Sequence, residues 1–298
     1  MTDRRATDDV RDGRVEANGV DFAYLELGEG PLALCLHGFP DTAWGWRPLM
    51  AALAHAGYRA VAPFMRGYAP TAVPEDGRYQ TGVLALDAVA LHEVLGGDGD
   101  AVIVGHDWGA LATYGAAAHA PERWRRVVAA SVPPASVIGE LLLDYDVIQA
   151  NTWYQFFFCN PLADLAVPLD DLAFIDRLWA DWSPGYDGAA DAARVKEALR
   201  EPGRITAALG YYRQTLGAAP QDPALAHVQN LTFTPPPRPT LYLHGVDDGC
   251  MPCPERRALE VAFTHEGSRV QLVAGAGHFL QYEQPDVVNA AIVDFVTG

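Results

Sequence analysis

One segment constrains the fold more than any other. At 102–110 the chain reads VIVGHDWGA, an apolar run that passes through a glycine-flanked aspartate into small residues. The run predicts a buried strand, and the small residues predict a helix packed closely on it. Glycine at 105 and 109 suits a sharp turn that strains the backbone of its central residue, Asp107. This layout is that of a nucleophile elbow with aspartate where serine often stands, although the pattern alone also fits an aspartate that only caps the helix.

A second strand end favours a functional role for Asp107. At 34–40 the chain reads LCLHGFP, an apolar run that ends in His-Gly. The backbone N–H groups of Phe39 and Trp108 are the candidate oxyanion hole, because two converging donors beside a nucleophile stabilise developing negative charge. The side chains of His37, Phe39 and Trp108 are candidate substrate contacts.

Short apolar runs alternate with helical periodicity along most of the chain. The predicted strands cover 22–27, 32–36, 59–63, 101–104, 127–131, 240–243 and 270–273, and the predicted helices begin at Trp108 or cover 80–95 and 285–296. Alternation of this kind predicts an α/β fold, with a mostly parallel sheet and helices on both of its faces.

The middle of the chain has a different pattern, which divides the sequence into a core and an insertion. Between 134 and 239 no clear strand is visible, aromatic residues cluster, and three prolines at 235–237 mark the exit. We predict a helical lid (cap) over 134–239, inserted into a core formed by 14–133 and 240–298. Residues 1–13 lack apolar periodicity and are predicted to be a flexible tail.

Two late strands end in groups that could complete a catalytic set with Asp107. The chain reads LYLHGVDD at 241–248, so the turn carries two adjacent carboxylates, Asp247 and Asp248, either of which could orient an imidazole. It reads VQLVAGAGHF at 270–279, so a loop presents His278 as the candidate general base. The order of nucleophile, acid and histidine is the one expected of hydrolases built on such an elbow.

Charge and cysteine usage argue against several function classes. The formal net charge is 21 − 38 = −17, which disfavours nucleic acid and anionic membranes as partners because both need a basic face. No apolar run reaches the roughly 18 residues of a spanning helix, and the first residues do not resemble a signal peptide, so we expect a cytoplasmic protein. Cys250 and Cys253 form one CxxC without a second pair, which leaves a metal role unsupported and their pairing open.

Several motifs together resemble the epoxide hydrolases of the α/β-hydrolase fold, from about Arg14 to the C-terminus. They are GHDWG at 105–109, HGFP at 37–40 with WR at 46–47, RGY at 66–68, GVDD at 245–248 and GHF at 277–279. The resemblance implies a mostly parallel eight-stranded sheet with helices on both faces and an inserted helical lid. It also implies a Gly-x-x-Asp turn for the acid, which Asp248 fits, with Asp247 as the alternative.

The same resemblance implies two lid tyrosines that hold and protonate the epoxide oxygen. The segments WYQF at 153–156 and YYR at 211–213 resemble the two sites. These roles fall to Tyr154 and Tyr212, with Trp153 as a further substrate contact. The tyrosines that stay open as alternatives are Tyr211, Tyr145 and Tyr186.

The implied reaction converts an epoxide to a vicinal diol. Asp107 attacks a ring carbon and forms a hydroxyalkyl ester, and His278, oriented by Asp248, activates the water that hydrolyses it. The scheme needs no cofactor and no metal. The aromatic lid predicts a small-molecule epoxide that is apolar or aryl-bearing, and the protein could be a monomer or a homodimer.

Two other functions remain open on the sequence. A haloalkane dehalogenase shares the aspartate nucleophile, and Trp108 could help to bind halide, but such an enzyme has no need of paired lid tyrosines. Many dehalogenases also carry an asparagine where this chain has Phe39. A non-catalytic ligand-binding protein could keep the fold, because the scaffold alone does not determine function.

Overall fold

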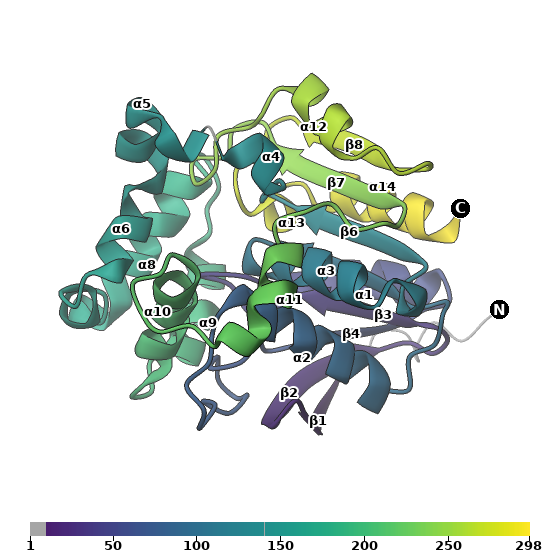
Figure 1. Ribbon diagram of the computed structural model, residues 1–298, viewed down its shortest axis with the longest axis horizontal. Coiled ribbons are helices and arrows are strands. Elements are labelled where there is room, and N and C mark those ends of the chain that lie inside the picture. The colour runs from purple at the N-terminus through teal and green to yellow at the C-terminus, as the bar shows by residue number, and fades with distance from the viewer. Residues whose placement is uncertain (1–9, 140) are drawn as a thin grey trace.

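The architecture is a single eight-stranded sheet covered by helices (Figure 1). The structure is a computed structural model that describes residues 10–139 and 141–298. The strand order is β1-β2-β4-β3-β5-β6-β7-β8. The strands are β1 (Arg11–Ala17), β2 (Val20–Leu27), β3 (Leu32–Leu36), β4 (Arg59–Pro63), β5 (Val102–His106), β6 (Arg126–Ala130), β7 (Thr240–Gly245) and β8 (Arg269–Val273). In this order every neighbouring pair from β4 to β8 is parallel, whereas the pairs β1–β2 and β2–β4 are antiparallel. The predicted mostly parallel sheet is confirmed.

Strand β1 corrects the prediction that residues 1–13 form a tail. Residues 11–13 belong to β1, which pairs with β2 from Arg11 to Ala17, while residues 1–9 lie outside the described part of the chain. The strand has no apolar run because it is an edge strand with one side in solvent. The turn that joins it to β2 is Asn18-Gly19, both with positive φ, which is a strong hairpin signal in a sequence.

Helices cover both faces of the sheet, and the three predicted helices are present. The core helices are α1 (Arg47–His55), α2 (Thr81–Val94), α3 (Trp108–His119), α12 (Arg256–Ala262), α13 (Leu280–Glu283) and α14 (Pro285–Thr297). Helix α1 packs against α14, and α2 packs against α3. Strands β3 and β5 are buried along their whole length, because parallel strands between two helical layers meet no solvent.

The chain between β6 and β7 is helical and lies largely to one side of the sheet (Figure 1). Its helices are α4 (Ala135–Ile138), α5 (Tyr145–Val147), α6 (Trp153–Cys159), α7 (Ala163–Ala166), α8 (Leu169–Trp182), α9 (Ala189–Leu199), α10 (Arg204–Thr215) and α11 (Ala226–Leu231). The short helical turns in the described part of the chain are η1 (Ala43–Trp46), η2 (Pro121–Arg123), η3 (Leu141–Leu143), η4 (Ile148–Thr152) and η5 (Pro223–Leu225). Helix α11 packs against α2 and α3 rather than with the other insertion helices. Within 10–139 and 141–298, no helix has both the length and the apolar character that crossing a bilayer requires.

Parallel pairing positions the candidate site. Asp107 follows β5 directly, and Asp248 and His278 lie in the loops that follow β7 and β8. Because the carboxyl ends of parallel strands share one edge of a sheet, these loops meet there, which is where ligands of open α/β sheets bind. The insertion covers this edge.

Candidate active site

The turn at Asp107 has the strained geometry that the sequence predicts. Asp107 has φ 55° and ψ −120°, and its side chain makes no capping hydrogen bond to α3. A Cβ on Gly105 would lie 2.1 Å from the Gly109 carbonyl oxygen, and one on Gly109 would lie 2.1 Å from the Leu36 carbonyl oxygen. Both glycines are therefore sterically required. The side chain of Asp107 therefore does not cap α3.

One backbone donor contacts the Asp107 carboxylate directly. The Phe39 N–H donates to Asp107 Oδ1 over 2.7 Å, and a Cβ on Gly38 would lie 2.2 Å from the same oxygen, so glycine permits this approach. Trp108 is the first residue of α3, where the backbone N–H has no partner within the helix. The Phe39 N–H therefore contacts the carboxylate, and the role of the Trp108 N–H as the second oxyanion donor stays a prediction.

Asp248, and not Asp247, faces the histidine. Asp248 is buried, and its Oδ2 lies 3.0 Å from His278 Nδ1. Its Oδ1 accepts the N–H groups of Cys250 and Met251, both over 2.8 Å. Burial alone would raise the pKa of Asp248, but the charge and hydrogen bond of His278 hold that pKa below its ordinary value. Asp247 is exposed and does not take part.

His278 lies between two carboxylates. Its Nε2 is 3.7 Å from Asp107 Oδ2 and is buried without a hydrogen-bond partner among the described residues. Its backbone carbonyl accepts from His106 Nε2 and Ser131 Oγ, over 2.8 and 3.0 Å, which fixes the loop. Burial opposes the imidazolium, but the neighbouring carboxylates of Asp248 and Asp107 outweigh burial and raise the pKa of His278 well above its ordinary value.

A small, mainly apolar cavity opens above Asp107. Its volume is about 150 Å³. The residues that line it include Asp107, Trp108, Leu111, Ile138, Tyr154, Gln155, Tyr212, Phe233, Cys250 and Met251. Tyr154 and Tyr212 pack edge to face with ring centroids 5.7 Å apart, and burial raises the pKa of both hydroxyls well above the ordinary value.

The hydroxyls of the two cavity tyrosines have different surroundings. Tyr154 Oη accepts from the Gln155 side-chain amide over 3.3 Å and lies 3.2 Å from Cys250 Sγ. Tyr212 Oη is buried and has no hydrogen-bond partner in the described part of the chain. Buried hydroxyls normally find a partner, so this one marks a place for a ligand atom.

The alternative tyrosines lie elsewhere. Tyr211 donates its hydroxyl to the Arg66 carbonyl over 2.8 Å, because successive residues of a helix point in different directions. Tyr186 donates to Asp191, and Tyr145 is 74% exposed. Tyr154 and Tyr212 are therefore the two of these tyrosines that line the cavity.

Three predicted substrate contacts are not among the residues that line this cavity. His37 is fully buried, with Nδ1 2.9 Å from the Gly38 carbonyl oxygen and Nε2 accepting the Met65 N–H, so both ring nitrogens are used by the backbone. The Phe39 side chain packs against the lid aromatics and is not part of the cavity lining. Trp153 is 42% exposed and is not part of the cavity lining. Trp108 does line the cavity, and its buried Nε1 has no partner among the described residues.

Cys250 is the cavity residue that the sequence did not reveal as part of the site. All four cysteines are free thiols, so Cys250 and Cys253 do not pair. Asp248, Cys250 and His278 offer ligand atoms within 4.8 Å of one another, an arrangement that could hold a metal ion. Two of these groups are already hydrogen-bonded to each other, so a metal would have to replace that bond.

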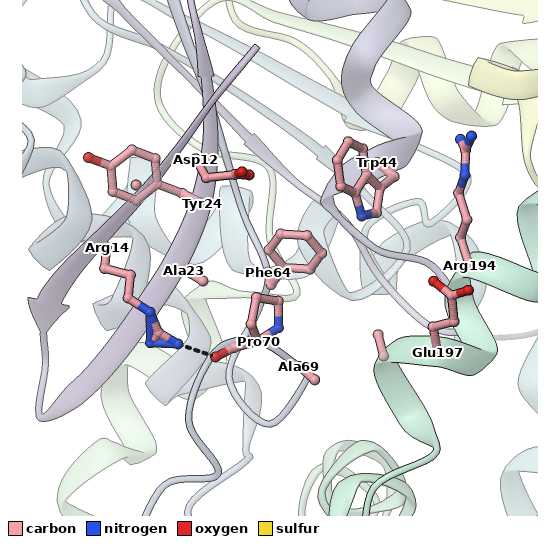
Figure 2. A pocket seen from close by; sticks show the side chains of 12 residues that line it. Asp12, Arg14, Ala23, Tyr24, Trp44, Phe64, Ala69, Pro70, Arg194 and Glu197 are labelled. Carbon is pink, nitrogen blue, oxygen red and sulfur yellow. Dashed lines mark hydrogen bonds between the residues drawn. The ribbon is translucent and has the colours of Figure 1, made fainter.

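A larger hollow than the cavity at Asp107 lies elsewhere in the described structure. Figure 2 shows a groove of about 560 Å³ between the β1–β2 edge and α9, with Trp44, Phe64 and Arg194 around it. It is more open than the cavity at Asp107, and Asp107, Asp248 and His278 are not among its lining residues. Volume alone would select this groove, whereas Asp107 and the buried unpartnered hydroxyl of Tyr212 select the smaller cavity.

Comparison with known proteins agrees with the fold. Residues 31–285 match the family described as alpha/beta hydrolase fold. The AB hydrolase superfamily protein YfhM of Bacillus subtilis is 27% identical over 97% of this chain and 99% of its own length. The chain therefore belongs to the α/β-hydrolase family.

Within that family, the relatives include proteins named epoxide hydrolases. Epoxide hydrolase A of Mycobacterium tuberculosis is 30% identical over 95% of this chain and 96% of its own length. The crystal structure of epoxide hydrolase A from Mycobacterium thermoresistibile matches with a TM-score of 0.78 and 28% identity, over 97% of this chain and 99% of the other. The resemblance inferred from the motifs is confirmed.

Proposed function

We propose that this chain is an epoxide hydrolase that forms a vicinal diol through an ester on Asp107. One observation carries the proposal: the lid tyrosines Tyr154 and Tyr212 line the same 150 Å³ cavity as Asp107. Opening an epoxide needs a nucleophile at carbon and a hydrogen-bond donor at oxygen, and this cavity holds both kinds of group. The names of the relatives support the same activity.

The first step is attack by Asp107 on a ring carbon. A carboxylate suits this step, because the ester that it forms can later be cleaved by water at the aspartate's own carbonyl. Tyr212, whose buried hydroxyl is unpartnered in the described residues, donates to the departing oxygen together with Tyr154. A serine at this position would give an ether, which water does not cleave under these conditions.

The second step is hydrolysis of the ester. His278, oriented by Asp248, removes a proton from a water molecule that attacks the Asp107 carboxyl carbon. The Phe39 N–H, which donates to Asp107 Oδ1, and the Trp108 N–H then stabilise the oxyanion. The diol leaves and the carboxylate is restored.

The cavity also indicates the size and polarity of the substrate. Its volume of about 150 Å³ is smaller than the roughly 300–1,000 Å³ of pockets that hold drug-sized ligands. Its lining is mainly apolar, with Leu111, Ile138 and Phe233 among the side chains. We therefore propose a small epoxide with an apolar or aryl substituent.

One observation favours a second candidate, a haloalkane dehalogenase. The Trp108 indole N–H is buried in the cavity wall without a partner among the described residues, and such a donor could bind halide. That reaction leaves the two lid hydroxyls without a role, which is why we rank it second.

A paired assay tests the proposal and separates the two candidates. Wild type and Asp107→Asn are incubated with styrene oxide and with 1-bromobutane, and diol and bromide are measured. We expect diol from wild type only, with Asp107→Asn folded but inactive. Bromide without diol would instead establish the dehalogenase, and no product from either substrate would favour a non-catalytic ligand-binding protein.

A further inference from the structure

The Cys250 thiol lies between a lid tyrosine and the histidine. Cys250 follows β7, two residues after Asp248, and its backbone N–H donates to that aspartate. Its Sγ lies 3.2 Å from Tyr154 Oη and within 4.8 Å of a ring nitrogen of His278. The side chain is 1% exposed. A single thiol thus lies next to both Tyr154, the proposed donor to the epoxide, and His278, the proposed base that activates water.

The reaction proposed above creates a proton imbalance at these two groups. When Tyr154 protonates the ring oxygen, it becomes a phenolate. When Asp107 becomes an ester, it loses its negative charge, so the imidazolium of His278 loses the carboxylate 3.7 Å from Nε2. His278 can accept a proton from water only after it has lost its own. One group therefore lacks a proton while the other carries one too many.

We propose that the Cys250 thiol relays a proton from His278 to Tyr154 between the two chemical steps, and this inference rests on the proposed epoxide hydrolase function. The imidazolium N–H gives its proton to Sγ as the S–H proton passes to the phenolate oxygen. The thiol ends as a thiol, Tyr154 is a phenol again and His278 is neutral. Hydrolysis then returns one proton from water to His278, so the cycle closes without an external acid.

The electrostatics of the cavity support a neutral carrier. Burial raises the pKa of the Cys250 thiol to about 11, although His278 lowers it in part. At neutral pH the thiol is therefore protonated and has a proton to pass on. Tyr154 and Cys250 are 2% and 1% exposed, so bulk water has little direct access to either group. A relay inside the protein replaces proton exchange with solvent.

Single-turnover kinetics test the relay. The protein is mixed with styrene oxide, quenched at successive times and weighed intact, so that formation and decay of the Asp107 ester are measured separately. Cys250→Val removes the S–H and keeps a similar volume, whereas Cys250→Ser keeps an exchangeable proton. Cys253→Val is the matched control, because the Cys253 thiol bonds only the neighbouring Pro254 carbonyl in the described structure.

The relay predicts a selective effect on ester decay. In Cys250→Val the ester forms within about twofold of the wild-type rate and decays about tenfold more slowly or worse, since positioned proton transfer contributes about 10²–10⁴ in rate. In Cys250→Ser the ester decays at a rate within about threefold of wild type, and in Cys253→Val the rates of ester formation and decay are unchanged.

Other outcomes overturn the relay. Decay at the wild-type rate in Cys250→Val would overturn it, and so would equal slowing in the valine and serine variants, which would indicate packing alone. If Cys250→Val does not fold by circular dichroism, Cys250→Ala is judged by the same criteria. If the wild type forms neither ester nor diol, the proposed function is overturned. If the wild type forms diol and ester decay in Cys250→Val is not slowed, the relay alone is overturned.

Discussion

Tyr212 is only 2% exposed, and its hydroxyl has no hydrogen-bond partner among the described residues. Replacing Tyr212 by phenylalanine removes this hydroxyl. A buried polar group without a partner costs about 1–3 kcal/mol. We therefore expect Tyr212→Phe to raise the free energy of unfolding by about 1 kcal/mol, which is about 2 °C in Tm for a protein of this size. A donor to a developing oxyanion contributes about 2.7–4 kcal/mol, so kcat on styrene oxide falls by about 10²–10³.

The neighbouring tyrosine is a matched control with the opposite expectation. Tyr211 donates to the buried Arg66 carbonyl, and Tyr211→Phe leaves that oxygen unpaired. We expect a loss of about 1–2 kcal/mol in stability and a kcat within about threefold of wild type. Thermal unfolding and steady-state diol formation measure both quantities. A Tyr212→Phe protein that loses stability and keeps its activity would refute the argument.

Two further predictions concern the groups around His278. Asp248→Asn lowers kcat on the order of 10³-fold, because the imidazole loses the carboxylate that orients it. In the control variant of the exposed residue, Asp247→Asn, kcat stays within about twofold of wild type. Equal effects on kcat would contradict the assignment of Asp248 as the acid. Because the pKa of His278 is raised, its ion pairs stabilise the folded state fully below about pH 6.5 and this contribution is lost as pH rises through the raised pKa. The difference in unfolding free energy between wild type and His278→Gln, measured by denaturant titration, therefore shrinks as pH rises, and a difference that grows would show the opposite sign of shift.

Most of the fold was predictable from strand–turn–helix signals in the sequence. The elbow around Asp107 was predictable because only glycine fits at 105 and 109. Strand β1 was missed because an edge strand with one face in solvent has no apolar run, although Asn18-Gly19 could have indicated its hairpin. Long buried strands are visible in a sequence, and short polar edge strands are visible mainly through their turns.

The direction of side chains was the part that the sequence could not supply. The side chains of His37, Phe39 and Trp153 stand next to the motifs, yet they bond the backbone or pack among aromatic residues and are not part of the cavity lining. Cys250 enters the site because the fold brings Tyr154, 96 positions away, to its thiol. The contact between Cys250 and Tyr154 depends on how the insertion packs against the sheet domain, and no local sequence pattern predicts that packing.

The central claim is that Asp107 becomes an ester, and isotope labelling tests it most directly. A single turnover of styrene oxide is run in water enriched in the heavy isotope of oxygen, and the peptides that contain Asp107 and Asp248 are weighed after digestion. The account predicts one heavy oxygen in the Asp107 peptide, none in the Asp248 peptide, and a diol that carries only light oxygen. A heavy diol beside an unlabelled Asp107 peptide would show that water attacks the epoxide directly and would contradict the account.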